Sequence, residues 1–125
     1  MTARVFLAIV GLAYFFLAGW CAWMPDQTSA AVGFTLQKGS GQSEFLTVYG
    51  GLEFALGAVF LLPMIMPGKT SEVLMLCLWL HVCLVLFRTG GFTVFKEVPP
   101  MTYALASVEW VIFLGSGWIW WAGRK

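Results

Sequence analysis

The sequence predicts an all-α membrane protein, a four-helix transmembrane bundle in which successive helices run up, down, up and down. Hydrophobic residues make up 60% of the chain and charged residues only 10%, whereas a typical soluble protein has about 25% charged residues. The apolar residues gather in four blocks of about 20, the length at which a helix crosses the roughly 30 Å hydrocarbon layer of a bilayer. With 125 residues in total, the four spans form a single domain.

The predicted spans cover residues 5–24, 44–63, 71–88 and 101–121. Proline disfavours helix in the residue before it and suits the first turn of a helix that follows it. Pro25 therefore ends the first span, Pro63 ends the second and Pro100 begins the fourth, while a Gly-Gly pair follows the third. The connections are short, so neighbouring helices pack antiparallel. In the first connection, residues 28–36 are expected to form a short helix on the membrane surface.

Two helix faces rich in small residues indicate where helices approach each other closely. On span two, Gly50 and Gly57 lie on one face. Small side chains at such positions let the backbone of a neighbouring membrane helix come near. On span one, the corresponding face recurs at helical spacing and consists of Ala8, Gly11, Phe15, Ala18 and Ala22.

Lysine and arginine are distributed almost evenly between the two sides of the predicted bundle. The side that holds both termini and the middle loop carries Arg4, Lys69, Arg124 and Lys125. The other side carries Lys38, Arg88 and Lys96. Because cytoplasmic loops of membrane proteins are enriched in these residues, the count of four against three places both termini in the cytoplasm.

The composition argues against two kinds of site. A net charge of +1, without a basic stripe that neutralises phosphates, excludes nucleic acid as an expected partner. The three cysteines, Cys21, Cys77 and Cys83, contain no Cys-x-x-Cys pair. The sequence therefore predicts neither a disulfide framework nor a zinc ribbon, and the cysteines are expected to be apolar helix residues.

Three of the four spans carry an ionisable residue well inside the hydrocarbon layer: Glu53, His81 and Glu109. A charged group at the centre of a bilayer costs roughly 3 kcal/mol or more, so such residues usually face the interior of a bundle and find partners there. Counted from the ends of their helices, Glu53 is about 13 Å deep, and His81 and Glu109 are each about 10 Å deep. All three are therefore expected in one layer, in the outer half of the membrane.

Two further residues lie on the same helix faces. Arg88 is seven residues after His81, about two helical turns, and Tyr49 is one turn before Glu53. The sequence therefore predicts one polar cluster of candidate ligand-binding residues, formed by Tyr49, Glu53, His81, Arg88 and Glu109. Its two carboxylates repel each other unless a cation lies between them or one of them holds a proton.

Several of these residues have a plainer interpretation. The whole cluster is equally consistent with a buried network of hydrogen bonds whose only role is to fix the register of the helices. His81 alone is expected to be a neutral ring that is hydrogen-bonded to a carboxylate. Arg88 has the alternative of extending to lipid phosphates at the membrane surface.

A metal or haem site is a further alternative. Glu53, His81 and Glu109 are chemically acceptable to zinc or iron, Cys77 lies four residues from His81, and His81 suits an axial haem position. However, the chain has no Glu-x-x-His or His-x-x-x-His pair of the kind that helical bundles use for metals. No metal ligands are therefore assigned, and the cofactor, if any, is left open.

The run from Tyr49 to Gly57, Tyr-Gly-Gly-Leu-Glu-Phe-Ala-Leu-Gly, resembles the signature of a family of uncharacterised small four-helix bacterial membrane proteins that is similar to the DoxX-like group. Arg88 with the Gly-Gly pair that follows it, and Glu109, resemble the same pattern, so the likeness covers most of the chain from Glu44 onward. The resemblance implies a multi-pass protein of the bacterial inner membrane. Some DoxX-like members resemble membrane subunits of quinone-linked oxidoreductases. This chain lacks the cysteine pairs expected for thiol redox work.

The sequence is compatible with three functions and leaves open whether the protein is an enzyme. The first is a membrane module whose polar cluster binds a small lipophilic or protonatable ligand, such as a quinone head group. The second is a non-catalytic accessory subunit that packs against a larger membrane complex or forms a homo-oligomer. The third is a metal- or haem-dependent component of a membrane oxidoreductase.

Overall fold

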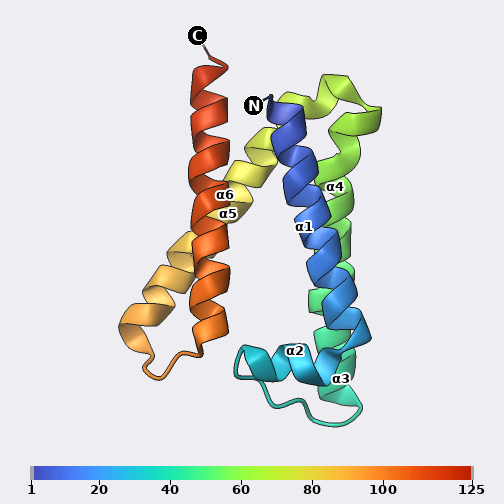
Figure 1. Ribbon diagram of the computed structural model, residues 1–125, viewed down its shortest axis with the longest axis vertical. Helices are drawn as coiled ribbons and strands as arrows, with labels where there is room; N and C mark the ends of the chain where they lie inside the picture. Colours follow the sequence, from blue (N-terminus) through green and yellow to red (C-terminus); the bar gives the residue numbers. More distant parts are fainter. Residues whose placement is uncertain (1, 125) are drawn as a thin grey trace.

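The computed structural model describes residues 2–124 and confirms the all-α fold class (Figure 1). Its helices are α1 (Ala3–Trp23), α2 (Pro25–Ala31), α3 (Ser40–Phe45), α4 (Glu53–Ile65), α5 (Thr70–Val94) and α6 (Pro100–Ala122). A π-helical segment, η1 (Leu46–Leu52), joins α3 to α4, and a 3₁₀ turn, η2 (Pro67–Lys69), precedes α5.

Four continuous helical segments are long and apolar enough to cross a membrane: Ala3–Trp23, Ser40–Ile65, Pro67–Val94 and Pro100–Ala122. Their outer faces carry large apolar side chains that water would not tolerate in such number. Phe16 is 72% exposed and Phe87 is 85% exposed, for example. Because lipid solvates these side chains as well as a protein core does, the chain is a small multi-pass membrane protein.

The spans pack as two antiparallel hairpins. In the first, α1 runs along α4, and in the second, α5 runs along α6 (Figure 1). The hairpins meet where the first half of α5 packs against α1 and α4, and they diverge toward the other end of α5. The side chains at the centre of this contact are Phe6, Leu7, Val10, Tyr14, Phe60, Val73, Leu74, Cys77 and Ile112.

Glycines set the close approach of α1 and α4, as the small-residue faces predict. A Cβ atom on Gly57 would lie 2.6 Å from a ring carbon of Phe15 and 3.0 Å from the carbonyl oxygen of Gly11. A Cβ on Gly11 would lie 2.8 Å from Cγ of Leu61. No side chain fits at either position without moving α1 away from α4.

Both ends of the described chain lie at the same end of the molecule, as four spans require (Figure 1). Lys125, which belongs to the count of basic residues, lies outside the described residues. At the opposite end, α2 and α3 lie below α1 and α4, and the loop after α2 approaches the start of α6. A Cβ on Gly33 would lie 3.3 Å from Cγ of Pro99, and the φ of +86° at Gly33 favours glycine.

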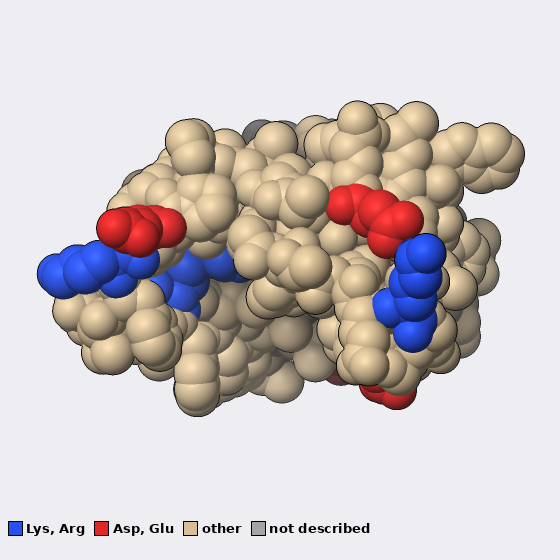
Figure 2. Space-filling view, turned by 90° about the horizontal axis from the view of Figure 1, so that it is seen from below, with Lys and Arg blue, Asp and Glu red and all other residues tan. Residues whose placement is uncertain are grey.

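This end of the molecule carries few charges (Figure 2). Lysine and arginine side chains lie in two separate groups, each beside acidic side chains, and the surface between the groups is uncharged.

Helix boundaries differ from the predicted spans in three places. The third helix continues past Gly90 and Gly91 to Val94, where the hydroxyl of Thr93 donates to the carbonyl oxygen of Gly90 and the N–H of Phe95 donates to that of Gly91. The second span contains Pro63 inside its last turns. The short helix of the first connection covers Pro25–Ala31 instead of residues 28–36. It begins earlier because Pro25 suits the first turn of a helix.

Candidate functional site

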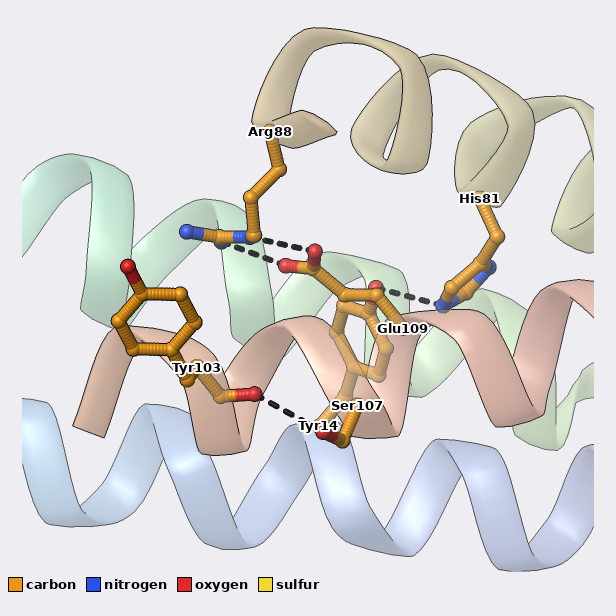
Figure 3. A network of polar contacts seen from close by, with 6 residues as sticks. All are labelled: Tyr14, His81, Arg88, Tyr103, Ser107 and Glu109. Atoms are coloured by element: carbon orange, nitrogen blue, oxygen red, sulfur yellow. Dashed lines mark hydrogen bonds and ion pairs between the residues drawn. The ribbon is translucent and has the colours of Figure 1, made fainter. Parts of the chain in front are cut away.

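An ion pair links α5 to α6 within the membrane-spanning part of the second hairpin (Figure 3). Nε of Arg88 donates to Oε2 of Glu109 at 2.5 Å, and Nη2 of Arg88 donates to Oε1 at 2.6 Å. The two side chains are 27% and 14% exposed. A planar guanidinium that binds both carboxylate oxygens makes strong charge-assisted hydrogen bonds. Arg88 therefore points into the protein and pairs with Glu109, instead of extending to lipid phosphates.

His81 is fully buried and forms a second polar contact, with Tyr14 of α1 (Figure 3). Its Nδ1 lies 2.8 Å from the carbonyl oxygen of Cys77, one turn earlier in α5. A carbonyl only accepts, so Nδ1 carries the hydrogen and donates it. In a neutral ring Nε2 is then the acceptor, and it receives the hydroxyl hydrogen of Tyr14 at 3.3 Å. Both nitrogens of His81 are engaged.

This arrangement differs from the expected bond between His81 and a carboxylate. The phenol of Tyr14 takes that place, and Tyr14 is the residue that the sequence reasoning missed. The signal was present: Tyr14 is a hydroxyl-bearing residue near the middle of a span without charges, and a buried phenol usually finds a hydrogen-bond partner. Its ring also packs edge-on against Phe60, with 5.2 Å between the ring centroids.

Glu53 differs from the other ionisable residues of the interior because its side chain lacks a partner. Its Oε2 atom is buried and has no hydrogen-bond partner among the described residues. Glu53 is the first residue of α4, on the helix face of the buried residues Gly57 and Phe60. It lies within electrostatic range of Glu109. A carboxylate oxygen in this setting is costly unless a donor reaches it or it holds a proton.

The π-helical segment η1 ends at the residue before Glu53. Such segments are rare and occur frequently at functional sites, where they change the direction of nearby side chains. Gly50 and Gly51 lie inside it and accept the altered backbone at low steric cost. Tyr49, in the same segment, stacks on Phe45 with 4.5 Å between ring centroids and lies within electrostatic range of Arg88 and Glu53.

In the structure, the five residues of the predicted cluster therefore form three separate groups and not one. Arg88 and Glu109 bind each other directly. Glu53 and Tyr49 lie near this pair without a hydrogen bond to it among the described contacts. His81 bonds to Tyr14 instead. With Tyr14 counted, each of the four spans supplies at least one polar group to the interior.

The donor set gives little support to a bound metal. Among residues 2–124, no three side chains of histidine, cysteine, aspartate or glutamate are grouped to hold a metal ion. Both nitrogens of His81 are already engaged, so axial binding to haem would break a hydrogen bond to Cys77 or to Tyr14. Sγ of Cys77 lies 3.7 Å from Nδ1 of His81, as a neighbour in the same helix.

Comparison with known proteins finds no similar one. No protein-family model, no curated protein and no solved structure matches this chain.

Proposed function

We propose that this protein is a membrane binding module that takes the polar head of a small lipophilic molecule, such as a quinone, into its interior. The observation that carries the proposal is the buried Oε2 atom of Glu53, which has no partner within the described chain. In hydrocarbon an unpartnered carboxyl oxygen destabilises the protein, since no water replaces the missing hydrogen bond. A ligand that brings a donor, or shares the proton of the carboxyl group, removes that cost.

The surrounding residues suit this role. The Arg88–Glu109 pair places a fixed dipole close to Glu53, and Arg88 keeps further N–H donors beyond the two that Glu109 uses. Tyr49 lies within electrostatic range of Glu53. His81 and Tyr14 hold α5 against α1 and so fix the position of these groups. The predicted orientation, with both termini in the cytoplasm, gives a ligand access from the outer leaflet of a bacterial inner membrane.

The resemblance of the segment around Glu53 to the DoxX-like group supports the same proposal, because some members of that group resemble membrane subunits of quinone-linked oxidoreductases. A metal- or haem-dependent activity has less support, since His81 has no free nitrogen in the described structure. A non-catalytic accessory subunit needs no unpartnered carboxylate, so Glu53 also argues for ligand binding over that role.

The test is ligand retention in the purified protein. Native mass spectrometry of the detergent-purified chain is expected to show a bound small molecule that the Glu53→Gln variant lacks, because an amide neither ionises nor transfers a proton. Glu44→Gln is the matched control, since Glu44 lies earlier in the same continuous helix and is exposed. Both variants are expected to keep the helical circular dichroism of the original chain.

The same measurement separates the alternatives. A ligand that stays bound in both Glu53→Gln and Glu109→Gln contradicts the proposal. A stoichiometric partner chain without a small molecule favours the accessory subunit instead.

A further inference from the structure

The ionisable side chains of the membrane interior do not balance in charge. Arg88 and Glu109 neutralise each other through two hydrogen bonds. His81 is neutral, because one ring nitrogen donates to a backbone carbonyl and the other accepts from Tyr14. Only Glu53 is left over, and its buried Oε2 atom meets no cation among residues 2–124. If Glu53 is ionised, the interior carries one uncompensated negative charge.

The groups around Glu53 do not supply the missing positive charge. Arg88 is the only cation of this region in the described chain, and it is already paired with Glu109. The remaining titratable groups that Glu53 faces are neutral or acidic. The groups within electrostatic range of Glu53 are Tyr14 and Cys21 on α1, Tyr49 in η1 and Glu109 on α6.

Two tyrosines lie within electrostatic range of Glu53. They are Tyr14 and Tyr49, which pack against Phe60 and Phe45 respectively. The faces of aromatic rings attract cations, and this attraction strengthens where water is excluded. An unpartnered carboxylate near tyrosine side chains favours a positively charged head group over a neutral one, because no cation of the described chain pairs with it.

We propose that Glu53 binds the head group of a lipophilic monovalent cation, which takes the place of the proton that Glu53 holds when the site is empty. This inference rests on the proposed function and narrows its ligand to a positively charged class, such as an amine or phosphonium. The exchange keeps the interior neutral in both states. When the cation binds, the O–H bond of the Glu53 carboxyl group breaks, the proton leaves to water, and the carboxylate pairs with the cation.

A neutral quinone behaves differently at the same site. Its carbonyl oxygens only accept hydrogen bonds, so the carboxyl group of Glu53 keeps its proton as the donor. Binding of a quinone is therefore expected to release no proton, whereas binding of a monovalent cation releases one.

The experiment compares two probes, methyltriphenylphosphonium as the cation and decylubiquinone as the neutral molecule. Binding to the purified full chain in detergent is measured by calorimetry, and proton release is measured in weakly buffered solution with a pH indicator. The cation is expected to bind with release of one proton, and its affinity is expected to fall as the pH is lowered, because protons compete for the same carboxylate. These two measurements need no variant.

Variants then assign the effect to Glu53. Glu53→Gln is expected to weaken binding of the cation roughly 30-fold or more, as loss of one partner from a buried charge pair does. Glu53→Asp keeps the charge and is expected to retain binding, and the exposed control Glu44→Gln is expected to match the original chain.

Each other outcome overturns the inference. Binding of decylubiquinone without the cation overturns the cation class and leaves the proposed function intact. Cation binding that releases no proton, or that persists unchanged in Glu53→Gln, overturns the role of Glu53. Failure of the original chain to bind either probe overturns both the inference and the proposed function.

Discussion

His81 and Glu53 are both ionisable residues inside the membrane-spanning bundle, yet they are accommodated in opposite ways. His81 is completely buried, and each of its nitrogens has a partner that suits the neutral ring. Burial of a neutral, fully hydrogen-bonded group costs little. Glu53 has a buried oxygen with no such partner in the described chain. His81 therefore contributes to the stability of the helix packing, whereas Glu53 has a carboxylate oxygen that lacks a hydrogen-bond partner among the described residues.

The pair of Arg88 and Glu109 lies between these extremes. Removing two charges from water costs several kcal/mol for each ion, and only good geometry with additional hydrogen bonds offsets that cost. The planar guanidinium meets both carboxylate oxygens, at 2.5 and 2.6 Å. The pair therefore joins α5 to α6 without leaving a net charge in the membrane.

The tautomer of His81 gives a direct test at this scale. His81 is the only histidine of the chain, so the ¹⁵N spectrum of histidine-labelled protein needs no assignment. We expect the neutral form with the hydrogen on Nδ1, because the carbonyl oxygen of Cys77 lies 2.8 Å from that nitrogen. Tyr14→Phe is expected to keep this tautomer and to lower the free energy of unfolding by about 1–2 kcal/mol, since Nε2 loses its donor.

The matched control for Tyr14→Phe is Tyr103→Phe. Tyr103 lies on α6 and is 50% exposed, so removal of its hydroxyl is expected to leave the unfolding free energy unchanged. Unfolding is followed by adding denaturing detergent to mixed micelles. A spectrum with the hydrogen on Nε2, or equal stability of the two variants, would contradict the assigned hydrogen bonds.

At the scale of elements, the close contact between α1 and α4 depends on two glycines. Gly11 of α1 and Gly57 of α4 face each other so closely that a Cβ on either meets a backbone carbonyl oxygen of the other at 2.9 or 3.0 Å. In lipid, where apolar burial does not drive helices together, such close packing is a main source of helix association. The seam between α1 and α4 therefore depends on the absence of side chains at these two positions.

Gly57→Ala is expected to destabilise the protein by about 1–3 kcal/mol, because the added methyl group overlaps with the ring of Phe15. Gly19→Ala is the control on the same helix pair, since a Cβ at Gly19 meets nothing within 4 Å. That change is expected to be neutral or slightly stabilising, given the higher helix propensity of alanine. Unfolding in mixed micelles measures both variants, and equal effects would show that the seam is not closely packed.

The second span combines α-helical and π-helical segments, and the change between them occurs next to Glu53. Helix α3, the π-helical η1 and α4 run continuously from Ser40 to Ile65, with Glu53 as the first residue after the π-helical part. A regular helix would place Tyr49 one turn from Glu53 along the same stripe. The wider turns of η1 alter that register, and Tyr49 stacks on Phe45.

At the scale of the whole molecule, two hairpins enclose the polar interior from both sides. Glu53 and Tyr14 belong to the first hairpin, and Arg88, Glu109 and His81 belong to the second. The hydrogen bond from Tyr14 to His81 crosses between them, and near the α2 end the backbone at Gly33 comes close to Pro99. The two hairpins must therefore pack together before the polar groups can meet.

Topology follows from the same architecture. Four spans place both termini on one side, and the count of basic residues predicts that this side faces the cytoplasm. In a bacterial host, green fluorescent protein fused to either terminus is expected to fluoresce, and alkaline phosphatase fused there is expected to be inactive. Phosphatase inserted after Lys38, in the loop between α2 and α3, is expected to be active and serves as the control.

Two outcomes of this test carry different meanings. Termini on opposite sides of the membrane would contradict the four-span fold. Termini together on the outer side would keep the fold and reverse the predicted orientation, so that a ligand would reach the site from the inner leaflet.

The sequence by itself determined the fold class, the four spans, and the set of residues that cannot remain alone in hydrocarbon. Those features depend on local composition and helical periodicity, because a helix satisfies its own backbone and only its length and apolar content decide whether it spans a bilayer. Depth along each helix also follows from residue counting. The sequence included Glu109 in the cluster by its depth and Arg88 by the helix face it shares with His81, and in the structure these two side chains bind each other.

Only the tertiary structure decided which partners those residues have. The direction in which a side chain points depends on how its helix is rotated about its own axis. Near Glu53 it also depends on the preceding π-helical segment. Neither can be recognised from the spacing of residues in the sequence. For that reason the sequence paired His81 with a carboxylate, whereas packing of α5 on α1 brings it to Tyr14. The same packing leaves Oε2 of Glu53 buried without a donor among the described residues.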